Sequence, residues 1–210
     1  MGIVIEKQVN AHCKLGVWHI TETYDELLSL LKLDQEDYQT MLAFLNPKRK
    51  LEWLSVRVLL YKLTQKHNKI LYNVNKRPYL TDHSHHISIS HSDEYSTILL
   101  CRNQHVGIDI EKMQPKIEHI AFKFLKKQEI DQIIPAHRIY HLYLHWCAKE
   151  ALYKLCDTQG MSMKQHITIE PFYPHKAGKM YGNIQYPFTE QRHQLNYFLI
   201  DNYPVVWCLK

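Results

Sequence analysis

The sequence lacks the features that mark fibrous, repetitive or membrane-spanning chains. Only 6 of its 210 residues are glycine, and neither a Gly/Ser linker nor a low-complexity segment divides it. No apolar run approaches the ~18 residues that a membrane-spanning helix requires. The first residues, Met1 to Lys7, contain no basic region followed by a long apolar stretch, so we expect no signal peptide. These absences predict a globular protein that works in the cytoplasm without a membrane partner.

Cysteine is also sparse, and its spacing argues against a disulfide framework. The 5 cysteines are far apart and no two form a CxxC pair. An odd number cannot all be paired within one chain. We therefore expect reduced and mostly buried thiols, as is usual in a cytoplasmic protein. The positions are Cys13, Cys101, Cys147, Cys156 and Cys208.

The charge is moderate and slightly basic. Charged residues make up 22% and hydrophobic residues 45% of the chain, and the formal net charge is +5. This composition supports a sizeable core. The basic excess suits an anionic ligand or an acidic partner but is too small for the signature of nucleic-acid binding, so we expect no nucleic-acid partner.

Apolar periodicity predicts helices packed on short strands in both halves of the chain. In the first half we expect helices at 24–33, 37–45 and 47–66, and strands at 3–6, 16–20, 87–90, 96–101 and 105–110. In the second half we expect helices at 117–125, 127–133 and 137–156, and strands at 167–170, 179–186, 195–200 and 205–209. The predicted fold class is α+β, with a boundary near residues 102–105.

The strand at 105–110 ends in the motif Gly-Ile-Asp-Ile-Glu. Side chains two apart on a strand share a face, so Asp109 and Glu111 project together while Ile108 and Ile110 face the core. Two adjacent carboxylates repel unless a cation or a proton joins them. A hard divalent ion such as Mg²⁺ would remove that conflict. A strand face exposed to solvent is the alternative, and the motif alone does not decide between them.

A second motif is Trp-Cys-Ala-Lys-Glu-Ala-Leu-Tyr-Lys, from Trp146 to Lys154. Helical geometry stacks Trp146, Glu150 and Lys154 on one face, with Lys149 beside them. Glu150 would add a third carboxylate, and the two lysines would hold phosphate oxygens or a leaving group. The alternative is a solvated face with Glu–Lys pairs. Trp146 argues against it, since a large aromatic on that face indicates partial burial.

A third motif is Ile-Ser-His-Ser, which ends at Ser92. A histidine flanked by hydroxyls at the end of a strand can donate hydrogen bonds to a phosphate, which makes His91 a candidate ligand. The nearby histidines at 83, 85 and 86 lack a complete set of zinc ligands at a recognised spacing. No Gly-x-Ser-x-Gly motif supports a hydrolase.

Taken in order, these motifs resemble those of the 4′-phosphopantetheinyl transferase superfamily. The resemblance extends from about Lys76 to Ile169, and the segment Trp146–Lys154 fits the pattern W-x-x-K-E-[AS]-x-x-K throughout. It is closer to the surfactin-synthetase-activating branch of single-chain, two-lobed enzymes. The motifs that carry it are Arg77-Pro78-Tyr79, Ile89-Ser90-His91-Ser92, Gly107-Ile108-Asp109-Ile110-Glu111 and the segment Trp146–Lys154.

The resemblance implies a holo-[acyl-carrier-protein] synthase type of transferase. Such an enzyme uses Mg²⁺ and moves the phosphopantetheine arm of coenzyme A onto a serine of an apo acyl or peptidyl carrier protein, releasing 3′,5′-adenosine bisphosphate. The pathways are fatty-acid, polyketide or nonribosomal peptide biosynthesis. The resemblance also implies two similar, pseudo-symmetric lobes, each a small antiparallel sheet packed with helices. Residues 1–103 would lie on the nucleotide side of coenzyme A and residues 104–210 on the metal and catalytic side. We expect a monomer.

Site residues follow from the same resemblance, position by position. The implied metal ligands are Asp109, Glu111 and Glu150. The implied catalytic residues are Glu129, which would help to deprotonate the acceptor serine, Glu150, and Lys154, which would steady the transferring phosphate. The implied coenzyme A contacts are Ser90 and His91 at the phosphates, Lys149 beside the pyrophosphate, Lys154, and Arg77 near the adenine and the 3′-phosphate.

Two positions depart from the family pattern. Lys76 replaces the glycine before Arg77, and Ser88 stands where asparagine is frequent. In the first half, a basic cluster on the helix at 47–66 is a candidate site for the 3′-phosphate, although a solvated helix start remains the alternative. Its members include Lys48, Arg49 and Arg57.

The carrier would dock through a basic and aromatic surface, for which an amphipathic helix with a solvated edge is the alternative. The residues concerned are Lys123, Lys126 and Lys127 around Phe122, Phe124 and Leu125. Two other functions stay open. One is a coenzyme A-binding module without transferase activity. The other is a nucleic-acid-binding protein or metal nuclease, which leaves the segment Trp146–Lys154 unexplained and predicts salt-sensitive binding.

Overall fold

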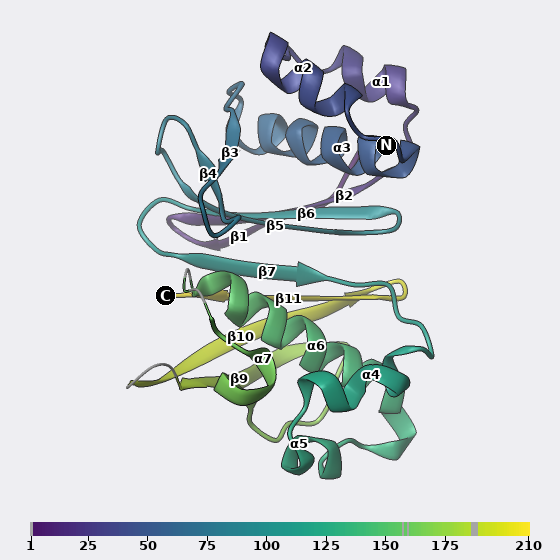
Figure 1. Ribbon diagram of the computed structural model, residues 1–210, viewed down its shortest axis with the longest axis vertical. Helices are drawn as coiled ribbons and strands as arrows, with labels where there is room; N and C mark the ends of the chain where they lie inside the picture. Colours follow the sequence, from purple (N-terminus) through teal and green to yellow (C-terminus); the bar gives the residue numbers. More distant parts are fainter. Residues whose placement is uncertain (1, 157, 159, 186–188) are drawn as a thin grey trace.

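A four-stranded and a five-stranded antiparallel sheet, one from each half of the chain, form the framework of the protein (Figure 1). The computed structural model describes residues 2–156, 158, 160–185 and 189–210. Each sheet is packed with helices, which confirms the predicted α+β class. In Figure 1 the two sheets follow one another along the long axis, with β5 and β7 at the junction between them.

The first half contributes the sheet β1-β2-β6-β5 and three helices. Its strands are β1 (Gly2–Asn10), β2 (Cys13–His19), β5 (His86–Ser92) and β6 (Tyr95–Cys101), with the short pair β3 (Ile70–Tyr72) and β4 (Pro78–Leu80) beside them. The helices are α1 (Tyr24–Ser29), α2 (Gln35–Leu42) and α3 (Pro47–Thr64). Helix α3 begins where the Asn46 side chain accepts the amide of Lys48 and proline occupies the first turn, a favourable start because proline lacks a donor there.

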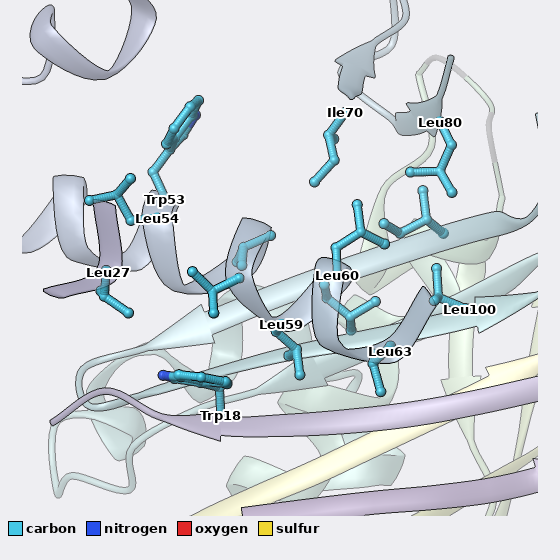
Figure 2. Packing of buried hydrophobic residues seen from close by; sticks show 14 of the residues in the cluster. Trp18, Leu27, Trp53, Leu54, Leu59, Leu60, Leu63, Ile70, Leu80 and Leu100 are labelled. Carbon is cyan, nitrogen blue, oxygen red and sulfur yellow. The ribbon is translucent and has the colours of Figure 1, made fainter. Parts of the chain in front are cut away.

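The apolar residues of α3 pack on this sheet. Figure 2 shows Leu59 next to Trp18 of β2 and Leu63 on the side of Leu100 of β6, all within one buried cluster. Trp18 and Leu100 are almost completely buried and Leu59 is fully buried. Burial of such side chains contributes roughly 1.5–3 kcal/mol each. The helix is thereby held firmly on the sheet that carries β5.

The second half contributes the sheet β7-β11-β10-β9-β8 and the remaining helices. Its strands are β7 (Val106–Ile110), β8 (Ile167–Ile169), β9 (Ala177–Gln185), β10 (Glu190–Ile200) and β11 (Tyr203–Leu209). The helices are α4 (Ile117–Phe124), α5 (Lys127–Asp131), the 3₁₀ turn η1 (Pro135–His137), α6 (Arg138–Leu155) and α7 (Met163–His166). Figure 1 shows α6 running across the face of this sheet.

Helix α6 approaches β7 closely at Gly107. A Cβ atom at this position would lie 2.0 Å from the backbone oxygen of Ala151. Glycine is required at this position because it has no side chain, and any Cβ atom would clash with the helix backbone. The close approach brings the last turns of α6, with Glu150 and Lys154, beside Asp109.

The two sheets meet through serine side chains of β5. Ser88 and Ser92 share one face of the strand with Ser90, since alternate residues point the same way. The Oγ of Ser88 accepts the amide of Ile108 at 3.0 Å, and the Oγ of Ser92 accepts the amide of Lys112 at 3.0 Å. On the other face of β7, Ile108 enters a buried cluster that includes residues of β2, β6 and β11. The junction thus combines apolar packing with hydroxyl bridges.

The expectation that all cysteines are reduced is wrong for one pair. Cys13 of β2 and Cys101 of β6 form a disulfide. Strand pairing places them directly opposite each other, although 88 residues separate them in sequence. Because the pairing register was not known from the sequence, spacing alone did not reveal this contact. Cys147, Cys156 and Cys208 are free.

Element boundaries differ from the predictions at several helix and strand ends. The helix predicted at 24–33 ends at Ser29, and Leu30 is its C-cap residue. The helix predicted at 127–133 ends at Asp131. Strand β9 begins at Ala177, before the predicted start at 179, and the predicted end at 186 lies outside the described residues. Strands β3 and β4 were not predicted. None of the helices in the described ranges combines the length and apolarity needed to cross a bilayer.

Replacing Gly107 by alanine should lower the free energy of unfolding by about 1–3 kcal/mol, because the new methyl group forces α6 away from β7. Urea unfolding of Gly107→Ala measures the loss. Gly16→Ala is the matched control: its Cβ would meet terminal side-chain atoms of Leu59 and Leu63 at 2.9 Å, which can move more easily than backbone. If Gly107→Ala lowered the free energy of unfolding no more than Gly16→Ala does, a close backbone contact at Gly107 would be contradicted.

Candidate active site

A cavity of 740 Å³ lies at the junction of the two halves. Its walls come from α3, the β3–β4 segment and β5 on one side, and from β7 and the end of α6 on the other. The volume lies within the range of about 300–1,000 Å³ that is usual for small-molecule sites. Acidic residues gather toward β7 and α6, and basic residues toward α3 and the β3–β4 segment.

Asp109, Glu111 and Glu150 line the acidic end. Strand β7 carries Asp109, Glu111 follows directly after it, and Glu150 comes from α6. Burial, followed by the charge of Asp109, raises the pKa of Glu150 to about 7. The same two causes raise the pKa of Glu111. The three carboxylates therefore affect one another, and a proton or a cation would relieve their repulsion.

Lys154 joins this acidic end to β5. Its Nζ donates to Oδ1 of Asp109 at 2.7 Å, to Oγ of Ser90 at 3.1 Å and to the backbone oxygen of Ile108 at 3.1 Å. Ser90 in turn donates to Asp109 at 2.7 Å, and Ser92 donates to Glu111 at 2.9 Å. Lys154 and Ser90 thus hold Asp109 in the cavity wall, and Ser92 holds Glu111.

The donor set at the acidic end suits a hard divalent cation. The second oxygen of Asp109, Oδ2, is buried and has no hydrogen-bond partner among the described residues. An unpaired buried carboxylate oxygen is costly, and oxygen donors of this kind are the preferred ligands of Mg²⁺. In the side-chain arrangement of the described residues, however, no three His, Cys, Asp or Glu groups come together as a metal-holding cluster.

Arg49, Glu52 and His91 form a polar network on the opposite wall. The Nδ1 of His91 lies 3.2 Å from Glu52, and an Nη1 atom of Arg49 contacts both His91 Nε2 and, at 3.3 Å, Glu52. Because arginine can only donate, Nε2 accepts and Nδ1–H donates to Glu52. Burial lowers the pKa of His91, while Glu52 opposes that shift. The imidazole is therefore neutral at pH 7 in this arrangement.

Arg57 and Arg77 also line the cavity, whereas Lys48 is not among its lining residues. Arg57 is nearly buried, lies 3.5 Å from Asp37 and stacks 3.2 Å from the ring centre of Trp53. Burial lowers its pKa to about 10. Arg77 reaches the second half of the chain, where its Nη2 donates to Nδ1 of His105 at 3.0 Å.

Lys48 and Lys76 flank the basic side. Lys48 forms an ion pair with Asp93 at the β5–β6 turn. Lys76 lines the cavity and has a positive φ of 61°, a left-handed conformation that costs a non-glycine residue about 1–2 kcal/mol. This residue replaces the glycine of the related motif, and the structure keeps the backbone conformation that glycine would favour.

Comparison with known families gives a match in the half of the chain that holds the acidic end. Residues 105–208 match the family model of the 4′-phosphopantetheinyl transferase superfamily. The match begins just before β7 and ends within β11, so it includes Asp109, Glu111, Glu150 and Lys154. No curated protein sequence matches the chain.

Within the matched residues, Glu129 and Lys149 do not line the cavity. Lys149 is fully buried, and its Nζ donates to Glu129 at 2.7 Å and to the backbone oxygen of Ile167 at 2.8 Å. Burial lowers the pKa of Lys149, and Glu129 opposes this. Neighbouring residues on a helix point about 100° apart, so Lys149 faces the protein interior while Glu150 faces the cavity. This placement differs from the position beside the pyrophosphate that the resemblance implied.

Sequence reasoning did not identify Glu52 or Tyr153 as cavity residues. A weak signal existed for Glu52, since it follows Arg49 by three residues on the helix and the two side chains meet. Tyr153 precedes Lys154 and is 40% exposed, so its helical position alone did not separate it from a solvated surface residue.

The titration of Glu150 gives a pH prediction. Its folded pKa of about 7 exceeds the ordinary 4.5, so the stability due to its bound proton is present below that ordinary value and is lost as the pH rises toward 7. The wild type and Glu150→Gln are compared in the presence of a chelator. The wild-type free energy of unfolding minus that of the variant should decrease as the pH rises from about 5 to about 7. Urea unfolding across that range measures the difference. A difference independent of pH would contradict the shift.

The left-handed backbone conformation of Lys76 gives a stability prediction. Lys76→Gly should raise the free energy of unfolding by about 0.5–1 kcal/mol, since relief of the left-handed strain exceeds the added chain entropy. Lys127→Gly, at a helical position without positive φ, is the control and should destabilise the protein. Thermal unfolding compares them, and a destabilised Lys76→Gly variant would contradict the interpretation.

Proposed function

We propose that the protein is a 4′-phosphopantetheinyl transferase of the surfactin-synthetase-activating type. It transfers the phosphopantetheine arm of coenzyme A to a serine of an apo carrier protein. The observation that carries this proposal is the combination, in one cavity, of Asp109, Glu111 and Glu150 with Lys154 and an opposing basic wall. The family match over residues 105–208 supports it.

Asp109, Glu111 and Glu150 would hold the magnesium ion. Two observations support this. The Oδ2 of Asp109 is buried and has no hydrogen-bond partner among the described residues, and the pKa of Glu150 is raised. A bound cation would stabilise the ionised form of both carboxylates. When bound, Mg²⁺ neutralises charge on phosphate oxygens. Ser90 and Ser92 orient the carboxylates of Asp109 and Glu111 through their hydrogen bonds.

The basic wall would bind the nucleotide part of coenzyme A, which carries a pyrophosphate and a 3′-phosphate. Arg49, Arg57 and Arg77 supply cationic donors from three positions along the cavity. Guanidinium groups suit this task because they stay charged and bind phosphate through paired donors. His91, which lies between Arg49 and the acidic end, would donate to a phosphate after exchanging its contact with Glu52.

Transfer is then an in-line substitution at phosphorus. The acceptor serine oxygen forms a bond to the β-phosphorus, and the bond from that phosphorus to the bridging oxygen breaks. The electron pair leaves with 3′,5′-adenosine bisphosphate, and the serine proton passes to water in the cavity. Lys154, whose ammonium group already lies among Asp109 and Ser90, offsets charge on the phosphate oxygens.

The carrier protein would dock on the surface formed by Phe122, Lys123 and Lys127. Phe122 is 58% exposed, and both lysines are exposed beside it. Phe124 and Leu125, which the sequence placed in this surface, are buried and belong to the core under α4. Lys126 also turns away, because its Nζ donates to Thr168 at 2.6 Å. An exposed aromatic with two lysines suits an acidic partner.

The proposed activity predicts a covalent mass change. Purified protein mixed with coenzyme A, Mg²⁺ and a panel of apo carrier proteins should add roughly 340 Da to one serine of a carrier, and chelator should abolish the gain. Glu150→Gln should lower the rate by at least about 100-fold, because the variant loses one of three carboxylates. Intact mass spectrometry measures the product.

Glu170→Gln is the control, since Glu170 pairs with Arg192 at the surface and does not line the cavity. Its rate should equal that of the wild type. Binding of coenzyme A without a mass gain on any carrier would instead favour a binding module. Failure to bind coenzyme A would contradict the proposed function altogether.

A further inference from the structure

A buried ion pair in the second half has no part in the chemistry proposed above. Glu129 of α5 and Lys149 of α6 are 1% and 0% exposed, and 2.7 Å separates their charged atoms. Removing two charges from water is costly unless each finds a full set of partners. The environment of the pair provides such a set.

Glu129 uses both of its carboxylate oxygens in contacts within the protein. Oε2 accepts the amide of Lys126 at 2.8 Å as well as the ammonium of Lys149, and Oε1 accepts the amide of Ile169 at 2.9 Å. A general base must reach the proton that it removes. Because Glu129 is enclosed and does not line the cavity, an acceptor serine in the cavity has no route to it.

Lys149 is enclosed in the same way. Besides Glu129, its Nζ donates to the backbone oxygens of Ile167 at 2.8 Å and of Met163 at 3.5 Å. An ammonium group has three donors, so these contacts use all of them. A phosphate in the cavity would find no free donor on this side chain.

The pair joins three parts of the domain. Glu129 holds the start of α5 through the amide of Lys126. This start adjoins the docking surface, because Lys127 is the first residue of α5 and Phe122 and Lys123 lie in α4. Lys149 precedes Glu150 on α6, and the contacts at Ile167 and Ile169 attach both to β8. Figure 1 shows α4 and α5 extending beyond α6, away from the first sheet. The pair therefore sets the position of the docking surface relative to Glu150.

We propose that Glu129 and Lys149 are positioning residues that hold the docking surface in register with Glu150, so that a docked carrier presents its serine to the cavity. This inference rests on the proposed function. It assigns neither residue a contact with coenzyme A or with the acceptor serine. A single substitution could not tell whether a residue acts as a general base, as a phosphate ligand or as a positioning residue.

A double-mutant cycle distinguishes these three roles. Glu129→Gln alone leaves a buried ammonium group unpaired, and Lys149→Met alone leaves a buried carboxylate unpaired. The combined variant contains neither charge. No unpaired buried charge then disturbs the packing of α5, α6 and β8, so the docking surface is expected to keep its place. A lost general base or phosphate ligand is not restored by removing a second group.

The experiment measures kcat and KM for an apo carrier, and the Kd of coenzyme A by calorimetry, for the wild type, both single variants and the double variant. Each single variant should raise the carrier KM by about tenfold or more and leave the coenzyme A Kd within about twofold, whereas the double variant should return to within about threefold of the wild-type KM. Glu170→Gln, which breaks an exposed pair, should change neither constant.

Other outcomes overturn the inference. A kcat lowered by about 100-fold or more in Glu129→Gln and equally in the double variant would assign Glu129 as the base. A coenzyme A Kd raised in Lys149→Met and in the double variant would assign Lys149 as a phosphate ligand. If a single variant does not fold, the double variant still decides, because only the positioning role predicts that it is active. A wild type that binds coenzyme A but modifies no carrier would reject the proposed function, and this inference with it.

Discussion

The contact between α6 and β7 at Gly107 is the constraint on which the cavity depends. The helix backbone lies so close to the strand that a single methyl group would not fit between them. This closeness brings Glu150 and Lys154 from the helix to Asp109 on the strand. A helix at an ordinary helix–sheet distance would carry the same side chains too far from the strand carboxylates for them to share one ligand. The electrostatics of the site therefore depend on this close approach of helix and strand.

The cavity has two ends that favour ligands of opposite charge. At one end, burial and the neighbouring charge of Asp109 raise the pKa of Glu111 and of Glu150, so this end favours a cation or a proton. At the other, guanidinium groups favour an anion, and part of their charge is already balanced by Glu52 and Asp37. A ligand that carries phosphates at one end and accepts a cation beside them satisfies both parts together.

The sequence predicted the fold class and much of the cavity because both depend on short-range periodicity. Alternation along β7 put Asp109 and Glu111 on one face, and helical spacing put Glu150 and Lys154 together; the structure places all four on the cavity. Lys149 shows the limit of this reasoning. Helical spacing gives the angle between residues but not which side of the helix meets the sheet.

Contacts between distant segments explain the remaining differences. The disulfide joins residues 88 apart, and Glu129 receives donors from residues 20 and 40 positions away. No local pattern encodes such pairings, since they depend on how strands align after the chain has folded. The paired strands β3 and β4, each three residues long, are too short for any periodicity to emerge.

The serine bridges between β5 and β7 have a consequence for how the two halves move. The amides of Ile108 and Lys112 donate to hydroxyl groups of the other half rather than to backbone carbonyls of their own sheet. Parting of the halves would expose these two protons to solvent while the hydrogen bonds within each sheet remain closed. Their deuterium uptake therefore reports the breathing of the junction separately from the unfolding of either sheet. The backbone thus contains two natural probes of any separation of the two halves.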